Sequence, residues 1–516
     1  MNRNFWQGTI MVGVTVLIAS AVSAQETNEV ELLQRELREL RERMQSLEQK
    51  LNSAATNSTL LASPDSNGSA PTSASATPAK GWLPSDPLRI GRGGTYADIG
   101  FVGTFAAGGS TTKDIEGGTQ LGGHDPNQNG FTVQGVEMNL QGAVDPYLRG
   151  NANLLFSVDS GGESFMELEE AWLETVSLPG NFQIRAGQIL SEFGRANAQH
   201  PHTWGFVDSP LVNGRFLGAD GLRNPGARLS WLAPTPFYSE LMLGIQNSQG
   251  ETAASFRSDG DAHAGEGEER LPFGYRHAEN DRGVRHVTDL LFTPRYAMSF
   301  DVTDQQTLVL GASGAFGPNA SGGSGDTVTQ IYGLDLYWKW KPSNAHAGFP
   351  FVSFQTEVMV RRYQLGAFDW DENGNGGDND GDGFVDAGII TDATGLAPAV
   401  LASETVTDYG GYAQLLYGFR QGWVAGLRFD YVTGERAAYE RAGLLLVDGN
   451  GGGASLGRDP QRNERWRLTP NLTWYPTEFS KIRLQYNYDD RRDLGRDHSV
   501  WLQFEFLLGA HAAHKF

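Results

Sequence analysis

The chain of 516 residues contains no cysteine, which excludes disulfide frameworks, thiol nucleophiles and cysteine-based zinc sites. Positive charge is also scarce: 40 Lys and Arg face 61 Asp and Glu, and the formal net charge of −21 argues against a nucleic-acid partner. Outside the N-terminus, no apolar run approaches the roughly 18 residues of a membrane-spanning helix. The 39% of hydrophobic residues are nevertheless too many for a wholly disordered chain.

The N-terminus predicts an export signal over residues 1–24. Arg3 precedes an apolar stretch from Thr9 to Val22, and the small residues Ser23 and Ala24 suit a cleavage site before Gln25. A membrane anchor is the alternative, but about 14 residues are short for a membrane span.

Residues 25–52 predict a helical coiled coil. The segment from Arg43 to Glu48 resembles the short signature of parallel three-stranded coiled coils, in which a salt bridge between helices packs over the apolar seam. A single helix that lies on another domain is the alternative. Residues 53–88 are rich in Ser, Ala, Thr, Asn and Pro and predict a flexible linker. The heptad positions are Val30, Leu33, Leu37, Leu40, Met44, Leu47 and Leu51.

From residue 89 to residue 516 the hydrophobic period changes to two, as in strands with one apolar and one polar face. In the last segment Leu502 and Phe504 lie on the apolar face, and Trp501 is an exception on the polar one. Short turns and long loops alternate between the segments, which predicts an all-β transmembrane antiparallel barrel of about sixteen strands. A soluble sandwich or propeller would alternate too, but without this loop asymmetry. The predicted strands are 95–106, 131–144, 147–158, 165–177, 181–190, 226–234, 237–247, 287–303, 306–316, 327–341, 350–365, 404–419, 422–434, 464–475, 480–490 and 497–510.

An even number of strands places both ends of the barrel on the side of the short turns, which is the periplasm in outer-membrane barrels. We therefore expect the coiled coil in the periplasm. The predicted long loops run approximately over 107–129, 191–225, 248–286, 366–403 and 435–462.

The terminal Phe516 after an alternating strand resembles the sorting signature of Gram-negative outer-membrane barrels. The segments 185–188, 192–195 and 208–211 are similar to the fifth-strand region of the phosphate-selective porin (O/P-type) superfamily, which includes relatives labelled zinc-regulated TonB-dependent outer membrane receptors. This resemblance implies a trimeric outer-membrane barrel. With only 7 Lys among the basic residues, phosphate specificity is not carried over, and the lack of a plug-sized domain in residues 25–94 favours a passive pore.

Charged side chains on the polar face of the strands are candidates for lining a water-filled pore. A ladder of fixed charge selects ions because the low-dielectric wall focuses its field. Alternatively, these charges pair across neighbouring strands and only line a wide lumen, a reading that the mixture of signs favours. The predicted pore-lining residues are Arg185, Lys339, Arg361, Arg428, Arg465, Arg467, Arg483 and Glu505.

The long loop 191–225 follows the fifth predicted strand, and in porins loops of this kind fold inward and set the narrowest point. Packing outside the barrel or at a trimer contact is the alternative. The candidate constriction residues are Glu192, Arg195, His200, His202, Asp208 and Arg215.

Four acidic residues in the loop 366–403 match positions one, three, five and nine of a calcium loop, with Gly383 at position six. The bidentate Glu of position twelve is missing, because Ile389 stands there. A solvated acidic loop is the alternative. The predicted Ca²⁺ ligands are Asp378, Asp380, Asp382 and Asp386.

No catalytic motif stands out, so we do not expect an enzyme. The sequence favours an outer-membrane porin for passive diffusion of small hydrophilic solutes, with anions as a candidate class, through a homotrimer in lipid. A TonB-linked zinc or metal receptor is one alternative. The other is a structural barrel that tethers the envelope, with the coiled coil on peptidoglycan.

Overall fold

A computed structural model of the chain describes residues 88–92, 95–257, 271–278, 283–323, 325–371 and 374–509. The predicted signal peptide (1–24), the predicted coiled coil (25–52), nearly all of the predicted linker (53–88) and Phe516 lie outside the described residues. No helix in the described part is both long and apolar enough to cross a membrane.

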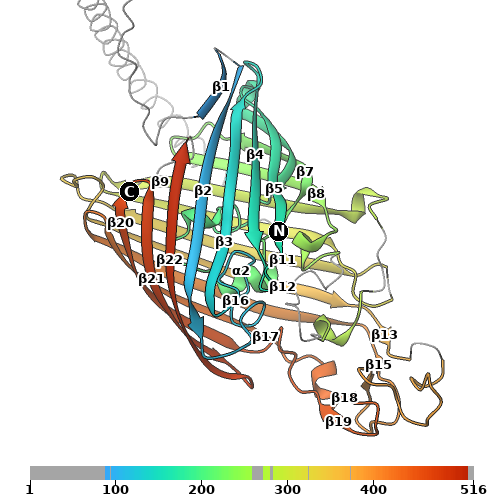
Figure 1. The fold of residues 1–516 in the computed structure, drawn as a ribbon. Coiled ribbons are helices and arrows are strands. Elements are labelled where there is room, and N and C mark those ends of the chain that lie inside the picture. Colours follow the sequence, from blue (N-terminus) through green and yellow to red (C-terminus); the bar gives the residue numbers. More distant parts are fainter. Residues whose placement is uncertain are drawn as a thin grey trace, which may run out of the picture. The chain divides into compact units, whose positions relative to one another are not determined.

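Sixteen long strands form one antiparallel sheet that closes on itself. Each strand pairs with the next along the chain, and the last, β22 (Gly495–Gly509), pairs with the first, β2 (Thr95–Ser110). The closed all-β barrel confirms the predicted fold class and the predicted strand number (Figure 1). The other barrel strands are β3 (Gly130–Ala143), β4 (Leu148–Val158), β5 (Ser164–Thr175), β6 (Phe182–Leu190), β7 (Arg223–Leu232), β8 (Tyr238–Asn247), β9 (Leu290–Thr303), β10 (Gln306–Pro318), β11 (Val328–Trp340), β12 (Phe351–Leu365), β16 (Glu404–Arg420), β17 (Trp423–Gly434), β20 (Arg465–Thr477) and β21 (Ser480–Arg491).

A short strand precedes the barrel, and further short elements lie between its strands. β1 (Leu88–Arg92) pairs with residues 95–99 of β2, whereas β22 pairs with β2 only from Gly100 onward. β1 therefore continues the ladder beyond the end of β22. The loop elements are η1 (Pro179–Asn181), η2 (Pro201–Thr203), α2 (Leu211–Phe216), η3 (Glu251–Ala253), η4 (Phe273–Tyr275), η5 (Val287–Asp289), β13 (Phe368–Asp369), β14 (Ile390–Thr391), β15 (Val400–Leu401), η6 (Tyr439–Arg441), β18 (Leu445–Val447) and β19 (Gly453–Ser455).

The outer face of the barrel is apolar and is edged by aromatic pairs. Leu334, Val358, Leu427 and Leu484 are among the aliphatic side chains exposed on it. Transmembrane barrels carry such a band between two aromatic girdles. Near the short turns the pairs are Phe182 with Trp231, Phe237 with Phe300 and Trp423 with Trp474; near the long loops they are Phe316 with Tyr332, Phe429 with Trp466 and Trp466 with Tyr488.

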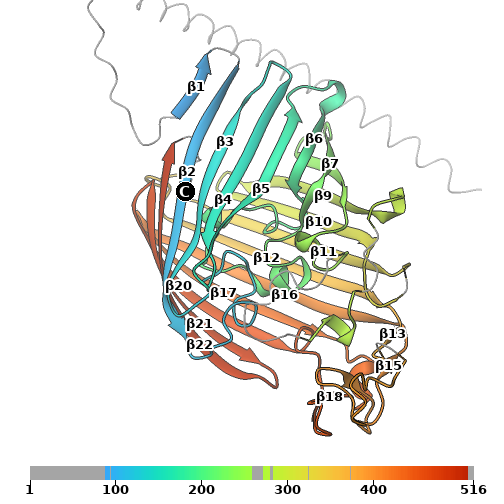
Figure 2. The ribbon, with the colours of Figure 1, turned by 45° about the vertical axis from the view of Figure 1, so that its right-hand side comes forward.

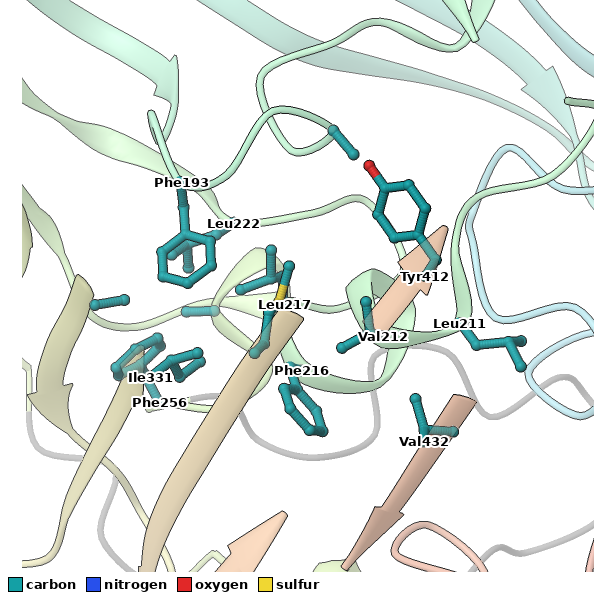
Figure 3. Packing of buried hydrophobic residues seen from close by; sticks show 14 of the residues in the cluster. Phe193, Leu211, Val212, Phe216, Leu217, Leu222, Phe256, Ile331, Tyr412 and Val432 are labelled. Carbon is teal, nitrogen blue, oxygen red and sulfur yellow. The ribbon is translucent and has the colours of Figure 1, made fainter. Parts of the chain in front are cut away.

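The barrel interior contains a hydrophobic core of its own. Residues 191–222, which we call the inward loop, bring Phe193, Val212 and Phe216 against the wall, and Figure 2 shows α2 of this loop among the strands. Ile331 and Val432 meet them from the wall, and Figure 3 shows this packing. All five side chains are buried to 0% exposure. The inward loop therefore packs like the interior of a globular domain.

Trp501, the exception in the alternating pattern of the last strand, belongs to the inner face. It is fully buried and packs with Ile115, from the loop after β2, and with Val207 of the inward loop. An apolar residue stands at an inward position there because two loops cover it.

The long loops beyond the barrel form a second apolar cluster. Tyr275, Trp370, Leu401 and Tyr439 are buried together there, although they come from three separate loops. The loop 366–403, for which the sequence predicted only a calcium loop, also contributes β14 to a three-stranded sheet with β18 and β19.

Candidate functional site: the barrel interior and its inward loop

The inward loop turns onto the far wall at a glycine. Gly194 has φ +60°, and a Cβ there would collide with Oε2 of Glu357 on β12. The backbone N–H of Gly194 donates to Oγ of Ser313 at 3.0 Å, and that of Ala196 donates to Oε1 of Glu357 at 2.7 Å. The first turn of the loop is therefore fixed to β10 and β12.

Asp208 holds the middle of the inward loop to three strands. Its fully buried carboxylate accepts hydrogen bonds from Arg428 at 2.6 Å, Arg467 at 3.0 Å, Gln485 at 2.9 Å and Asn487 at 2.8 Å. Burial raises the pKa of the Asp208 carboxyl, but Arg428 and Arg467 outweigh burial and hold the pKa below its usual value. Asp208 is therefore an anchor that is charged at neutral pH.

Other buried basic residues of the barrel wall also hold the loops, by donating hydrogen bonds to backbone carbonyl groups of the loops. Arg483 donates to the carbonyl oxygen atoms of Phe206 at 2.8 Å and Trp204 at 3.0 Å, and Lys481 donates to that of His202 at 2.8 Å. Arg361 binds Asp408 and the backbone carbonyl of Arg215. Arg465 and Arg467 both bind Asp489, and Arg465 also binds the backbone carbonyl of Gly118. Glu505 pairs with Lys481 at 2.7 Å.

Six of the eight predicted pore-lining residues therefore face inward but are covered. Arg361, Arg428, Arg465, Arg467 and Arg483 are at most 3% exposed, and so is Glu505. The structure places them under the loops, because the loop backbone supplies the carbonyl groups that the guanidinium groups bind. Arg185 and Lys339 are the two with accessible side chains.

Two further groups of basic residues on the inner wall include accessible side chains. Arg149, Arg185 and Arg228 share the carboxylate of Glu174, which is completely buried beneath them, while the Arg149 side chain remains 55% exposed. Arg228 also binds Glu192. Three positive charges thus face two negative ones.

The second basic group surrounds Tyr337 on β11. The guanidinium of Arg195 lies 4.0 Å from the centre of the Tyr337 ring, a cation–π contact. The charged groups that act on Lys339 are Lys341 and Arg195, which are both cations. This part of the wall therefore carries three neighbouring cations, Arg195, Lys339 and Lys341.

The remaining predicted constriction residues also lie inside the barrel. His200 and His202 face Glu137 of β3, and Arg215 donates to the carbonyl oxygen of Asn463 at 2.7 Å. The structure thus brings all six candidates, from Glu192 to Arg215, to inner surfaces. Packing of this loop on the outside, the alternative from sequence, is wrong.

Two groups of described residues bring three metal-ligand atoms within 4.8 Å of one another. One is Glu137, Glu169 and His200 inside the barrel. The other is Asp378, Asp380 and Asp382 in the acidic loop, and Asp386 of the predicted calcium set is not part of that group. The Asp386 carboxylate instead accepts the backbone N–H of Asn379 at 3.0 Å.

Sequence reasoning missed several interior residues that contact the inward loop. Asp125 was not a candidate, and it accepts the backbone N–H of Ser209 at 2.8 Å. Burial and the charge of Asp208 raise the pKa of the Asp125 carboxyl to about 7. Glu169 and Glu170 were also missed, although two adjacent acidic residues in an alternating strand are a visible irregularity.

No family model matches the chain. An uncharacterized protein of Aquifex aeolicus (strain VF5) is 30% identical over 418 residues, which cover 77% of this chain and 73% of that protein.

Among solved structures, the outer membrane channel DcaP of Acinetobacter baumannii shares 11% identity with a TM-score of 0.45, over 80% of this chain and 97% of that chain. Pseudomonas putida OprB shares 12% with a TM-score of 0.43, over 80% and 94% of the two chains. Because both scores are low, the barrel assignment rests on the strand pairing alone.

Proposed function

The chain belongs to the same family as the uncharacterized Aquifex aeolicus protein, and we propose that it is an outer-membrane porin for small hydrophilic solutes. One observation carries the proposal: a closed barrel with an apolar, aromatic-edged outside encloses a charged inside into which a long loop folds. Lipid accommodates the outer face, and no backbone edge is exposed to it. The solutes cross by diffusion, and no reaction is needed.

The cell location follows from the same features. Barrels of this kind with short turns at one end and long loops at the other occupy the outer membrane of Gram-negative bacteria. β1 begins and β22 ends at the short-turn side, so the periplasm is the proposed location of the N-terminal segment. The heptads of residues 25–52 support a homotrimer and offer a contact with peptidoglycan.

Anions are the proposed preferred solutes. Arg149, Arg185, Arg195 and Lys339 are accessible cations of the barrel interior, whereas Glu174 is covered by arginines and the accessible Glu192 is paired with Arg228. Fixed positive charge on a low-dielectric wall raises the local anion concentration.

The absence of cysteine from the chain allows a sharp test. Single substitutions Arg185→Cys, inside the barrel, and Leu334→Cys, on the lipid face, are reacted with a charged thiol reagent during planar-bilayer recording. We expect conductance steps from the purified protein and a reduced step only for Arg185→Cys, because the adduct obstructs the lumen. Folded protein that gives no steps, or equal effects at both positions, contradicts the proposal.

A further inference from the structure

An irregularity in β5 turns two adjacent glutamates to the same side. Asn153 and Leu154 of β4 stand opposite Glu170 and Leu168, so Glu169 has no partner across the ladder and forms a β-bulge. Leu168 is exposed outside, whereas Glu169 and Glu170 are both buried inside. Neighbouring strand residues normally alternate, so the bulge is what aims both carboxylates at the inward loop.

His200 of the inward loop meets the first of these carboxylates. Its Nδ1 lies 3.4 Å from Oε1 of Glu137 on β3 and 3.6 Å from Oε2 of Glu169. Glu137 is 5% and Glu169 is 3% exposed, so both belong to the interior. One nitrogen and two carboxylate oxygens from three separate segments thus converge on one point.

The two ring nitrogens of His200 have different surroundings. Nε2 lies 3.1 Å from Oε2 of Glu170 and 2.9 Å from Nδ2 of Asn153, so it either donates to the carboxylate or accepts from the amide. Nδ1 makes no hydrogen bond, nor does Oε2 of Glu169, although both atoms are buried. When Nε2 donates to the Glu170 carboxylate, Nδ1 keeps its lone pair for a metal.

We propose that Glu137, Glu169 and His200 bind a divalent transition-metal ion, with Zn²⁺ the best match, inside the barrel. Imidazole together with carboxylate suits Zn²⁺, whereas Ca²⁺ and Mg²⁺ prefer oxygen ligands alone. Three protein ligands leave the fourth tetrahedral position for water. One pocket is lined by Glu169 and His200 and another by Glu137 and Glu169, so there is open space next to the ligands.

Two more histidines orient the carboxylates. Nδ1 of His202 lies 3.0 Å from Oε2 of Glu137, and Nε2 of His124 lies 3.2 Å from Oε1 of Glu169. Each histidine therefore contacts the carboxylate oxygen that does not face Nδ1 of His200. The metal-free alternative is that protonated His200 alone balances the two carboxylates.

A bound metal would attach the inward loop to strands other than those that Asp208 binds. Asp208 joins the loop to β17, β20 and β21, whereas the proposed ligands join it to β3 and β5. The loop would then be held to two groups of strands, which β22 and β2 separate in the closed sheet.

Zinc binding to the purified full-length protein tests the inference. The protein is prepared without a histidine tag, stripped with a chelator, and titrated with ZnCl₂ by calorimetry in the presence of excess Ca²⁺. We expect one Zn²⁺ per chain for the wild type and for the controls His346→Gln and Asp378→Asn, which change exposed and acidic-loop residues. His200→Gln and Glu169→Gln should each weaken binding by at least about tenfold.

Wild-type protein alone keeps the inference falsifiable should a variant not fold. Co²⁺ added to stripped wild type should give the visible absorption of a four-coordinate site, and Zn²⁺ should abolish it. No stoichiometric binding, or equal binding by folded His200→Gln, overturns the inference and favours the protonated histidine. Because the readout is binding and not conductance, these outcomes are independent of the porin proposal.

Discussion

Arginines on two parts of the barrel wall have the same chemistry and opposite exposure. On β12, β17, β20 and β21 they are buried and bind carboxylates and loop carbonyl groups, whereas Arg149 and Arg185 on β4 and β6 stay accessible. The difference arises from what covers the wall, since only the first group lies under loop backbone. An inward-facing arginine therefore either binds a loop or faces the solutes, and it binds a loop where loop backbone covers it.

The largest effect is expected when Asp208, the main anchor of the inward loop, loses its charge. Asp208→Asn leaves Arg428 and Arg467 buried with one anionic partner fewer, so we expect a loss of about 3 kcal/mol in stability and a larger, noisier conductance. Thermal unfolding and single-channel recording measure both. The control Asp304→Asn changes an exposed turn residue and should alter neither. Unchanged unfolding in Asp208→Asn would mean that the loop is fastened elsewhere.

Charge reversal at the accessible cations Arg185 and Lys339 should alter ion selectivity, and at Arg185 it also removes one arginine partner of the buried Glu174. For Arg185→Glu combined with Lys339→Glu we expect the anion-to-cation permeability ratio to fall on the order of threefold, because the local potential changes sign. Reversal potentials in a salt gradient give the ratio. Arg492→Glu, at an exposed turn among the long loops, is the matched control. If both variants behave alike, the accessible arginines do not face the solute path.

Acidic pH should stabilise the packed inward loop. The folded pKa of Asp125, about 7, exceeds its ordinary value of 3.8, so the folded state binds the proton more tightly. This contribution to stability is complete below the lower value and is lost as pH rises toward the higher one. Protease protection of the inward loop should accordingly be greater at about pH 5 than at about pH 8. Asp125→Asn should weaken this dependence, and the raised pKa of His124, about 9, accounts for the part that remains. An unchanged dependence would show that Asp125 does not contribute.

The smallest effect is expected outside the barrel, where exposed carboxylates lie in the acidic loop. Asp378 accepts the backbone N–H groups of Gly381 and Gly383 at 2.7 and 2.8 Å, in a turn whose glycines have positive φ. Ca²⁺ binding remains a prediction here. Millimolar Ca²⁺ should slow proteolysis within residues 374–389, and Asp378→Asn should abolish that protection. Equal protection by Mg²⁺ would indicate screening of charge and not a site.

The strands could be predicted from sequence because lipid outside and polar groups inside impose a strict period of two. Every barrel strand lies within a few residues of its predicted bounds, and Trp501 broke the pattern only because loops form a core around it. β1 was missed since five residues carry too little periodicity. β1 pairs with the part of β2 that β22 leaves unpaired, so its position depends on where β22 ends.

The charged residues of the barrel interior could be predicted from sequence, but which of them bind the inward loop could not. Asp208 and Arg428 were both candidates, but they are 220 positions apart, and no local pattern couples them. Exposure depends on how the loop crosses the lumen. The Glu169 bulge had a sequence signal, two adjacent acids, but its direction requires the register with β4.

The position of β1 has a consequence for the seam where the first and last strands meet. Without β1, residues 95–99 of β2 would present free amide and carbonyl groups at the rim, a template for pairing with a stray strand. β1 occupies that template and so protects the rim from aggregation. A chain that reached the membrane without β1 could close its barrel and still pair with a neighbouring chain at the rim.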